Sequence, residues 1–138
     1  MKENNPLKLN DFTIKHQLQT RFRDVDAFQH INNAVFLSYF EDARKPFFNK
    51  WSLNLKNRSL IVASIKIDYF SQLKHPSTIT IGQKISRIGK TSFDVYASLF
   101  LNDEIISSCI TTIVCYDFDK QKSIDVYDEI KQDFNLNK

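Results

Sequence analysis

A short polar segment contains the side chains of this chain that are best suited to chemistry. Within ten residues it places two carboxylates, an imidazole and two carboxamides, namely Asp24, Asp26, His30, Asn32 and Asn33. A carboxylate can act as a general base on water or as a nucleophile, and a neighbouring imidazole or carboxamide can position water or polarise a carbonyl. The segment therefore indicates acyl transfer, in which a carbonyl oxygen gains negative charge.

The residues on either side of this segment predict the elements that hold it. Apolar and polar side chains alternate over residues 12–23, and this period of two predicts a strand that ends near Arg23. Over residues 36–51, aromatic and apolar residues recur every three or four positions, which predicts an amphipathic helix. Because proline removes a helical hydrogen bond, we expect Pro46 to stop or kink this helix near Lys45.

The start of the helix is expected beside the polar segment. Asn32 or Asn33 suits the N-cap position, because a short carboxamide can accept a hydrogen bond from the first turn. The first turn also has free backbone N–H groups and a partial positive charge, which favour an oxygen that gains negative charge. Asp26 and His30 are thus expected next to donors that stabilise an oxyanion.

The rest of the chain predicts four more strands and a short helix. Alternating patterns place the strands at residues 61–70, 79–85, 93–101 and 104–116, and apolar residues spaced by four place the helix at 126–134. The first of these strands is expected to bury one apolar face, made of Ile61, Ala63, Ile65, Ile67 and Tyr69. A single aromatic helix needs an antiparallel sheet curled around it, so residues 1–138 are expected to form one α+β domain.

Composition and charge argue against several classes of protein. The net charge is +3 with no Lys/Arg block, which argues against dedicated nucleic-acid binding but allows a small phosphate-bearing ligand. The first residues have no apolar signal core, and no apolar run approaches about eighteen residues, so neither secretion nor a membrane span is predicted. Cys109 and Cys115 share one strand face, too far apart for a disulfide and without zinc-ligand spacing, which favours free thiols in the cytoplasm.

The order of residues around the polar segment resembles a known family. The motifs are Asp24-x-Asp26, His30-Ile31-Asn32-Asn33 and Tyr39-Phe40-Glu41-x-Ala43-Arg44. They resemble the 4-hydroxybenzoyl-CoA thioesterase branch of the hotdog-fold acyl-CoA thioesterases. The resemblance implies a hotdog fold, with a five-stranded antiparallel sheet wrapped around one long central helix and a short C-terminal helix. It also implies a homodimer or homotetramer that hydrolyses an acyl-CoA, or as second choice an acyl carrier protein thioester, with no metal and no cofactor beyond the substrate's CoA.

Four side chains take roles from this resemblance. Asp26 holds the position of the family's catalytic acid, as general base or nucleophile, and its alternative role is to cap the backbone of its own loop. Asn33 is expected to position the thioester or water. His30 has the same expected role, with a hydrogen-bonded scaffold residue as the equal alternative. Glu41 is the second candidate acid, and its alternative is an ion pair with a cation one helical turn later.

Two other positions in the loop have different expected roles. Asp24 is expected to bond loop N–H groups or to pair with Arg23. Gln29 stands where the family has glycine, so it must reach a positive φ at a cost, or the loop is shaped differently. This departure favours the competing function, a non-catalytic protein that binds acyl thioesters. A dehydratase or hydratase of the same fold would need another Asp/His arrangement.

A basic turn later in the chain is the expected binding site for CoA. It consists of Arg87, Gly89, Lys90, Thr91 and Ser92, with cations, hydroxyls and exposed backbone N–H groups. Members of the family use basic residues in this region for the CoA nucleotide. Lys56 and Arg58 of a neighbouring subunit are expected to extend the patch. The alternative is a solubilised hairpin without a ligand.

Overall fold

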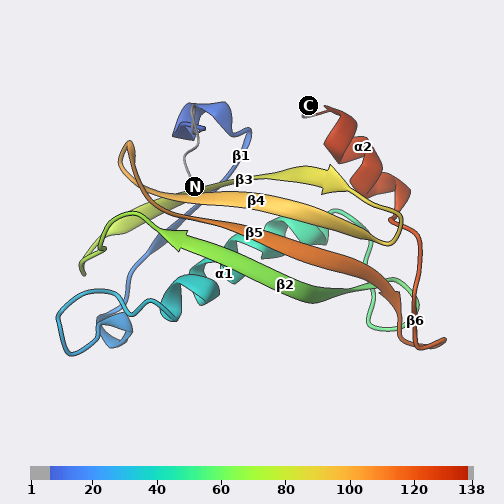
Figure 1. Cartoon of the computed structure of the whole chain (residues 1–138), viewed down its shortest axis with the longest axis horizontal. Coiled ribbons are helices and arrows are strands. Elements are labelled where there is room, and N and C mark those ends of the chain that lie inside the picture. The colour runs from blue at the N-terminus through green and yellow to red at the C-terminus, as the bar shows by residue number, and fades with distance from the viewer. Residues whose placement is uncertain (1–6, 137–138) are drawn as a thin grey trace.

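A curled antiparallel sheet surrounds one long helix in the computed structural model, which describes residues 7–136 (Figure 1). In chain order the elements are β1 (Ile14–Gln19), α1 (Val35–Asn49), β2 (Ser59–Tyr69), β3 (Thr78–Ile88), β4 (Ser92–Leu101), β5 (Glu104–Asp117), β6 (Lys122–Ser123) and α2 (Asp128–Leu136). The sheet order is β1-β3-β4-β5-β2, with β6 paired to β5, so β1 and β2 are the edges. The predicted arrangement is confirmed, and the two-residue β6 is an addition to it.

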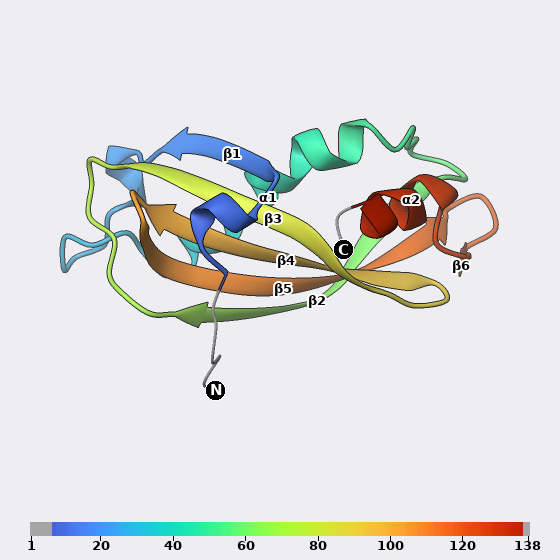
Figure 2. The same cartoon turned by 90° about the horizontal axis from the view of Figure 1, so that it is seen from above.

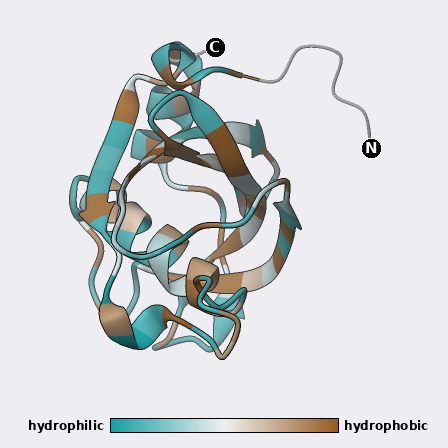
Figure 3. Cartoon of the chain, turned by 90° about the vertical axis from the view of Figure 1, so that its left-hand side faces the viewer, coloured by the Kyte–Doolittle hydropathy of each residue, from teal (hydrophilic) through white to brown (hydrophobic). Residues whose placement is uncertain are grey.

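Two further views show how the sheet and the helix fit together. From above, the sheet twists along its length and α2 lies near one end of it (Figure 2). From the side, the curl forms a ring around α1, with hydrophobic residues interspersed along the strands (Figure 3). None of the helices within residues 7–136 is long and apolar enough to cross a membrane.

The first strand is shorter than predicted. It ends at Gln19, and the chain then forms a 3-10 turn over Phe22–Asp24. Local hydrogen bonds explain the early end, since the Arg21 N–H donates to Asp24 Oδ2 at 3.1 Å and the Asp24 N–H donates to the Arg21 carbonyl at 2.9 Å. Such side-chain bonds compete with a sheet ladder, so the alternating pattern past Gln19 is not a strand.

The central helix begins later than predicted, and of the two outcomes expected at Pro46 the stop is wrong. Its N-cap is Ala34, although Asn32 still contributes because its Oδ1 accepts a hydrogen bond from the Ala34 N–H at 2.8 Å. Pro46 does not end the helix, which continues to Asn49. Burial outweighs the lost hydrogen bond, since Trp51, just beyond the helix, is 1% exposed and packs edge-on against a β4 ring.

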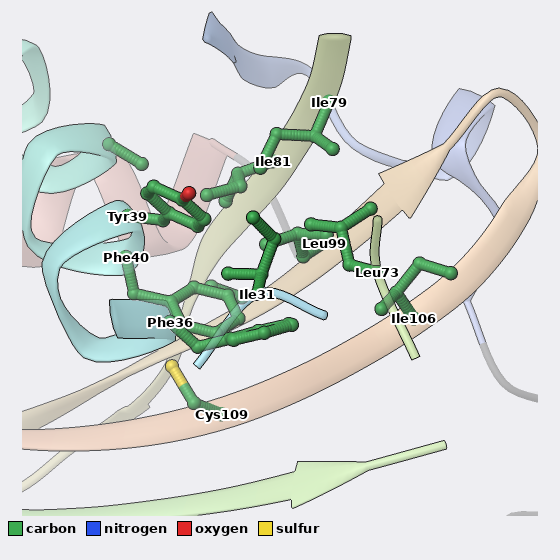
Figure 4. Packing of buried hydrophobic residues seen from close by; sticks show 12 residues of the cluster. Ile31, Phe36, Tyr39, Phe40, Leu73, Ile79, Ile81, Leu99, Ile106 and Cys109 are labelled. Carbon is green, nitrogen blue, oxygen red and sulfur yellow. The ribbon is translucent and has the colours of Figure 1, made fainter. Parts of the chain in front are cut away.

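Aromatic residues of α1 fill the centre of the sheet (Figure 4). The buried cluster next to the polar segment contains Ile31, Phe36, Tyr39, Phe40, Leu73, Ile79, Ile81, Leu99, Ile106 and Cys109. Both cysteines are free, as predicted. Burial raises the pKa of the Cys109 thiol to about 11, so it is protonated at neutral pH and is not a nucleophile.

The buried face of β2 differs from the prediction at its beginning. A bulge lies between Val62 and Ser64, and an extra residue reverses the alternation. Val62 is opposite Ile113, a fully buried residue, whereas Ile61 is opposite Val114 on the other face. The inner face therefore carries Val62 in place of Ile61, together with Ile65 and the residues that follow.

Candidate active site

The polar segment borders a hollow at one end of the sheet. This first hollow has a volume of about 520 Å³ and is lined by residues of the segment, α1 and the end of β2. Its lining residues include Asp26, Phe28, His30, Asn33, Phe36, Tyr69 and Phe70. Three of the four predicted catalytic residues thus meet there. Tyr69 and Phe70 were not predicted, because their strand pattern does not indicate which loop lies beside them.

Asp26 uses one carboxylate oxygen to hold its own loop. Oδ1 accepts hydrogen bonds from the N–H groups of Phe28 at 2.8 Å and His30 at 3.3 Å. The loop is also closed by the Asp26 N–H, which donates to the His30 carbonyl at 2.8 Å. Among residues 7–136, no group donates a hydrogen bond to Oδ2. The expected capping role is therefore present, and it leaves the second oxygen of the carboxylate for a ligand.

One backbone donor at the start of α1 is also unused. Every N–H from residue 28 to 37 donates to a group within the described part of the chain, except that of Asn33. This corrects the expectation that several donors of the first turn are free. Asn33 is also fixed through its carbonyl, which accepts a hydrogen bond from the Tyr69 hydroxyl at 2.6 Å. Burial raises the pKa of Tyr69, which keeps that hydroxyl protonated as a donor.

Gln29 adopts the backbone conformation that a glycine would favour. Its φ is 65°, in the left-handed region, where side chains other than those of Asn and Asp are uncommon. Its N–H donates to the Asp26 carbonyl at 3.1 Å and does not face a substrate. Of the two expected outcomes, Gln29 therefore reaches the positive φ, at a cost in strain.

Replacement of Gln29 by glycine is expected to raise the free energy of unfolding by about 0.5–1 kcal/mol, because relief of the left-handed strain exceeds the entropy lost on ordering glycine. Urea denaturation measures the change. The matched control is Gln17→Gly in the extended backbone of β1, which is expected to lower stability by a similar amount. Equal destabilisation by both substitutions would contradict strain at Gln29.

Glu41 is the one predicted catalytic residue that lies away from the first hollow. It is exposed on α1 and is not among the lining residues. Its expected ion pair with Arg44 or Lys45 is also wrong, since Lys45 pairs with Asp42 at 3.2 Å. Arg44 is instead buried, and its guanidinium donates to Thr111 Oγ1 at 3.2 Å.

The basic turn expected to bind CoA joins β3 to β4, at the opposite end of the sheet from the polar segment between β1 and α1 (Figure 1). Arg87 is neutralised there, since its guanidinium donates to both carboxylate oxygens of Asp94, at 2.9 and 3.1 Å. The Gly89 N–H donates to the Ser92 carbonyl at 2.7 Å. Of the turn's cations, Lys90 alone has no ion-pair partner among residues 7–136.

Arg58, which was expected to extend that patch, already has partners within its own chain. Arg58 donates to the Trp51 carbonyl at 3.1 Å and pairs with Glu129 of α2, so its charge holds the C-terminal helix to the end of α1.

No group of three or more potential ligands that could hold a metal ion occurs within residues 7–136.

Known proteins resemble this chain in both sequence and fold. A family model described as the thioesterase-like superfamily matches residues 20–134. The long-chain acyl-CoA thioesterase FadM of Escherichia coli K12 is 24% identical over 126 residues, which cover 86% of this chain and 95% of the relative. The uncharacterised protein YsmA of Bacillus subtilis 168 is 30% identical over 87 residues, or 62% of this chain and 59% of the relative.

Solved structures show the same fold. A thioesterase of Thermus thermophilus, solved with coenzyme A and zinc, has a TM-score of 0.80 at 26% identity and covers 89% of this chain and 98% of its own. A predicted thioesterase of Bacillus stearothermophilus has a TM-score of 0.83 at 23% identity, covering 90% and 95% respectively.

Proposed function

The chain belongs to the thioesterase-like superfamily, and from this membership we propose that it hydrolyses acyl-CoA thioesters at the first hollow. It is a thioester hydrolase with the hotdog fold. Two relatives support CoA as the carrier of the acyl group, because one is named for acyl-CoA and the other was solved with coenzyme A. A thioester of acyl carrier protein is the second candidate substrate.

A single observation carries the assignment of the site. Asp26 and Asn33 both line the first hollow, and neither Oδ2 of Asp26 nor the N–H of Asn33 has a hydrogen-bond partner among residues 7–136. One is a base or nucleophile and the other a donor for an oxyanion, which are the two groups that thioester hydrolysis requires.

The proposed reaction uses these two groups and water. Asp26 takes a proton from water as the water oxygen adds to the carbonyl carbon, and the resulting oxyanion accepts a hydrogen bond from the Asn33 N–H. When the C–S bond breaks, the proton on Asp26 passes to sulfur, so the products are the free acid and the CoA thiol. In the alternative, Asp26 attacks the carbon itself and the C–S bond breaks, which releases the CoA thiolate and leaves a mixed anhydride. Water then opens the anhydride to the free acid and the Asp26 carboxylate, and the proton that water gives up passes to the thiolate. His30 would help to position the water or the thioester.

The experiment that tests this function is release of free thiol from a panel of acyl-CoAs, from short aliphatic to aromatic and long-chain, with one acyl carrier protein thioester alongside. Turnover of any member supports a thioesterase and identifies its substrate class. The competing function, a non-catalytic binding protein, rests on Gln29, and this residue has the left-handed φ that a glycine favours.

We propose that the protein is a homodimer joined through β2, with a homotetramer of two such dimers as the larger form. β2 is a sheet edge, whereas β5 is paired on both sides. Two inner-face residues of β2 remain in water, Val62 at 43% and Ile65 at 38% exposed. A second copy pairing antiparallel along β2 would cover these side chains and satisfy the open strand edge.

The two free cysteines fit residence in the reducing cytoplasm.

Charges on the inner face of β2 are expected to break this dimer. The double variant Val62→Lys, Ile65→Lys should run as a monomer of 16.2 kDa in light scattering after size exclusion, since two lysines cannot be desolvated at an apolar contact. Both sites are partly exposed, so the protomer should still fold. Lys15→Glu on β1, the other sheet edge, is the control and should stay dimeric. A monomeric wild type, or a dimeric double variant, would overturn the arrangement.

A further inference from the structure

A second hollow adjoins the first on the other side of the polar segment. Its volume is about 750 Å³, and it shares Asp26, Phe28 and His30 with the first hollow. Its own lining includes Phe22, Lys74 and His75. Because the two hollows meet at Asp26, a long ligand whose reactive bond lies at this carboxylate can extend into both.

Two phenyl rings of the second hollow are left in water. Phe22 is 83% exposed and Phe28 is 80% exposed, although neighbouring aromatic residues of α1 are fully buried. Phe22 is held edge-on to the His75 ring, with the centroids 6.3 Å apart. Exposed rings at a hollow offer flat faces on which a planar base can stack.

The polar groups of the second hollow favour an anion. The Lys74 ammonium has no ion pair with any residue from 7 to 136. The His75 imidazole is held in place through Nδ1, which lies 2.8 Å from Thr20 Oγ1, and Nε2 remains for a ligand. Asp26 is the one carboxylate among the lining residues of this hollow. The charge of Asp24, in the same segment, is already neutralised by the Arg21 guanidinium at 3.0 Å.

The first hollow has the opposite character. Away from Asp26 it is walled by Phe36, Tyr69 and Phe70, and the rings of Phe36 and Tyr69 meet edge-on at 5.2 Å. No lysine or arginine is among its lining residues. An apolar acyl group fits this side of the site, whereas a polyanion does not.

We propose that the second hollow binds the nucleotide end of CoA, with the adenine on Phe22 and Phe28 and the phosphates at Lys74 and His75. This inference rests on the proposed acyl-CoA thioesterase function and gives the substrate a direction. The acyl group enters the first hollow, the thioester lies at Asp26, and the pantetheine arm passes Phe28 toward the solvent-exposed rings.

The rival site is the basic turn at the other end of the sheet. Its remaining unpaired cation is Lys90, and in a two-fold dimer along β2 the partner subunit's Lys90 would lie at the same end as Asp26. If the second hollow binds the nucleotide, substitution of Lys74 or Phe22 should weaken CoA binding. If the basic turn binds it, substitution of Lys90 should do so.

The experiment is calorimetric titration with an unhydrolysable S-hexyl-CoA thioether and with S-hexyl-pantetheine, which lacks the nucleotide. Lys74→Ala and Phe22→Ala should each raise the Kd for S-hexyl-CoA about five- to tenfold, through loss of a phosphate contact or of base stacking. The Kd for S-hexyl-pantetheine should stay within about twofold of wild type. The matched controls are Lys15→Ala and Leu55→Ala, which remove an exposed cation and an exposed apolar side chain elsewhere.

Each outcome decides one claim. If wild type binds S-hexyl-CoA and the Lys74 and Phe22 variants bind it equally well, the second hollow is not the nucleotide site. Weakening by Lys90→Ala alone would move the site to the basic turn. If wild type binds neither thioether, the proposed acyl-CoA function fails, whatever the variants do. Because no thiol is released in this assay, an inactive but binding-competent protein still tests the inference.

Discussion

Asp26→Asn is expected to lower kcat for an acyl-CoA by a factor of about 10² to 10⁴, the usual contribution of a positioned base, and by more if this residue is the nucleophile. Asparagine keeps the oxygen that caps the loop but cannot take a proton from water. The loop should therefore hold its shape, and the KM should change by less than about threefold. Thiol release detected with a chromogenic disulfide gives both constants.

A second carboxylate controls for the loss of charge. Asp103→Asn changes an exposed acid in the turn between β4 and β5, and it should leave kcat unchanged within experimental error. If Asp26→Asn keeps full turnover, Asp26 is not the catalytic acid. If wild type and variant are both inert while S-hexyl-CoA still binds, the catalytic claim fails and the non-catalytic binding protein takes its place.

Asp24→Ala is expected to give the largest loss of stability among the loop variants, about 3 kcal/mol of unfolding free energy at pH 7. Asp24 is 3% exposed and accepts hydrogen bonds from the Tyr39 hydroxyl at 2.5 Å and from the Arg21 guanidinium at 3.0 Å. Its removal leaves a buried hydroxyl without an acceptor. Tyr39→Phe removes only the hydroxyl and should cost about 1 kcal/mol. Urea denaturation of the three proteins measures both effects.

The pH dependence of this effect has a defined sign. Burial alone would raise the pKa of Asp24, but the hydrogen bonds from Tyr39 and Arg21 outweigh it and hold the pKa below its ordinary value. The stabilisation is therefore present above the unfolded pKa of about 3.9 and is lost as pH falls through the lower folded pKa. The stability difference between wild type and Asp24→Ala should shrink below about pH 4. A difference that grows on acidification would contradict the assignment.

The structural role expected for Asp24 is confirmed, but its partner is different. The sequence offers Arg23 as the adjacent cation, whereas the 3-10 turn brings Arg21 to the carboxylate and directs it toward Tyr39 on the central helix. A helical partner fifteen residues away leaves no local signal in the sequence, because hydrogen bonds between elements depend on how the elements pack.

The three side chains proposed for catalysis could be predicted as a group because they are local. Asp26, His30 and Asn33 lie within eight residues of one another, and a short loop before a helix places them together wherever the helix packs. The other two candidates are distant from this loop along the chain, and within one subunit the fold does not bring them to the hollow. Glu41 lies two turns into the helix and away from the hollow, and the basic turn lies at the far end of the sheet.

The type and order of the major elements could be predicted from the sequence, since a period of two or of 3.6 follows from which side chains the backbone can bury. The sequence also indicated the acid, the imidazole and the amide of the site. Three features became visible only in the folded chain: Pro46 remains inside the helix, Val62 faces inward, and the Tyr69 hydroxyl donates to the Asn33 carbonyl. These features depend on packing and hydrogen bonds between segments distant in sequence, where burial outweighs the local preference of the chain.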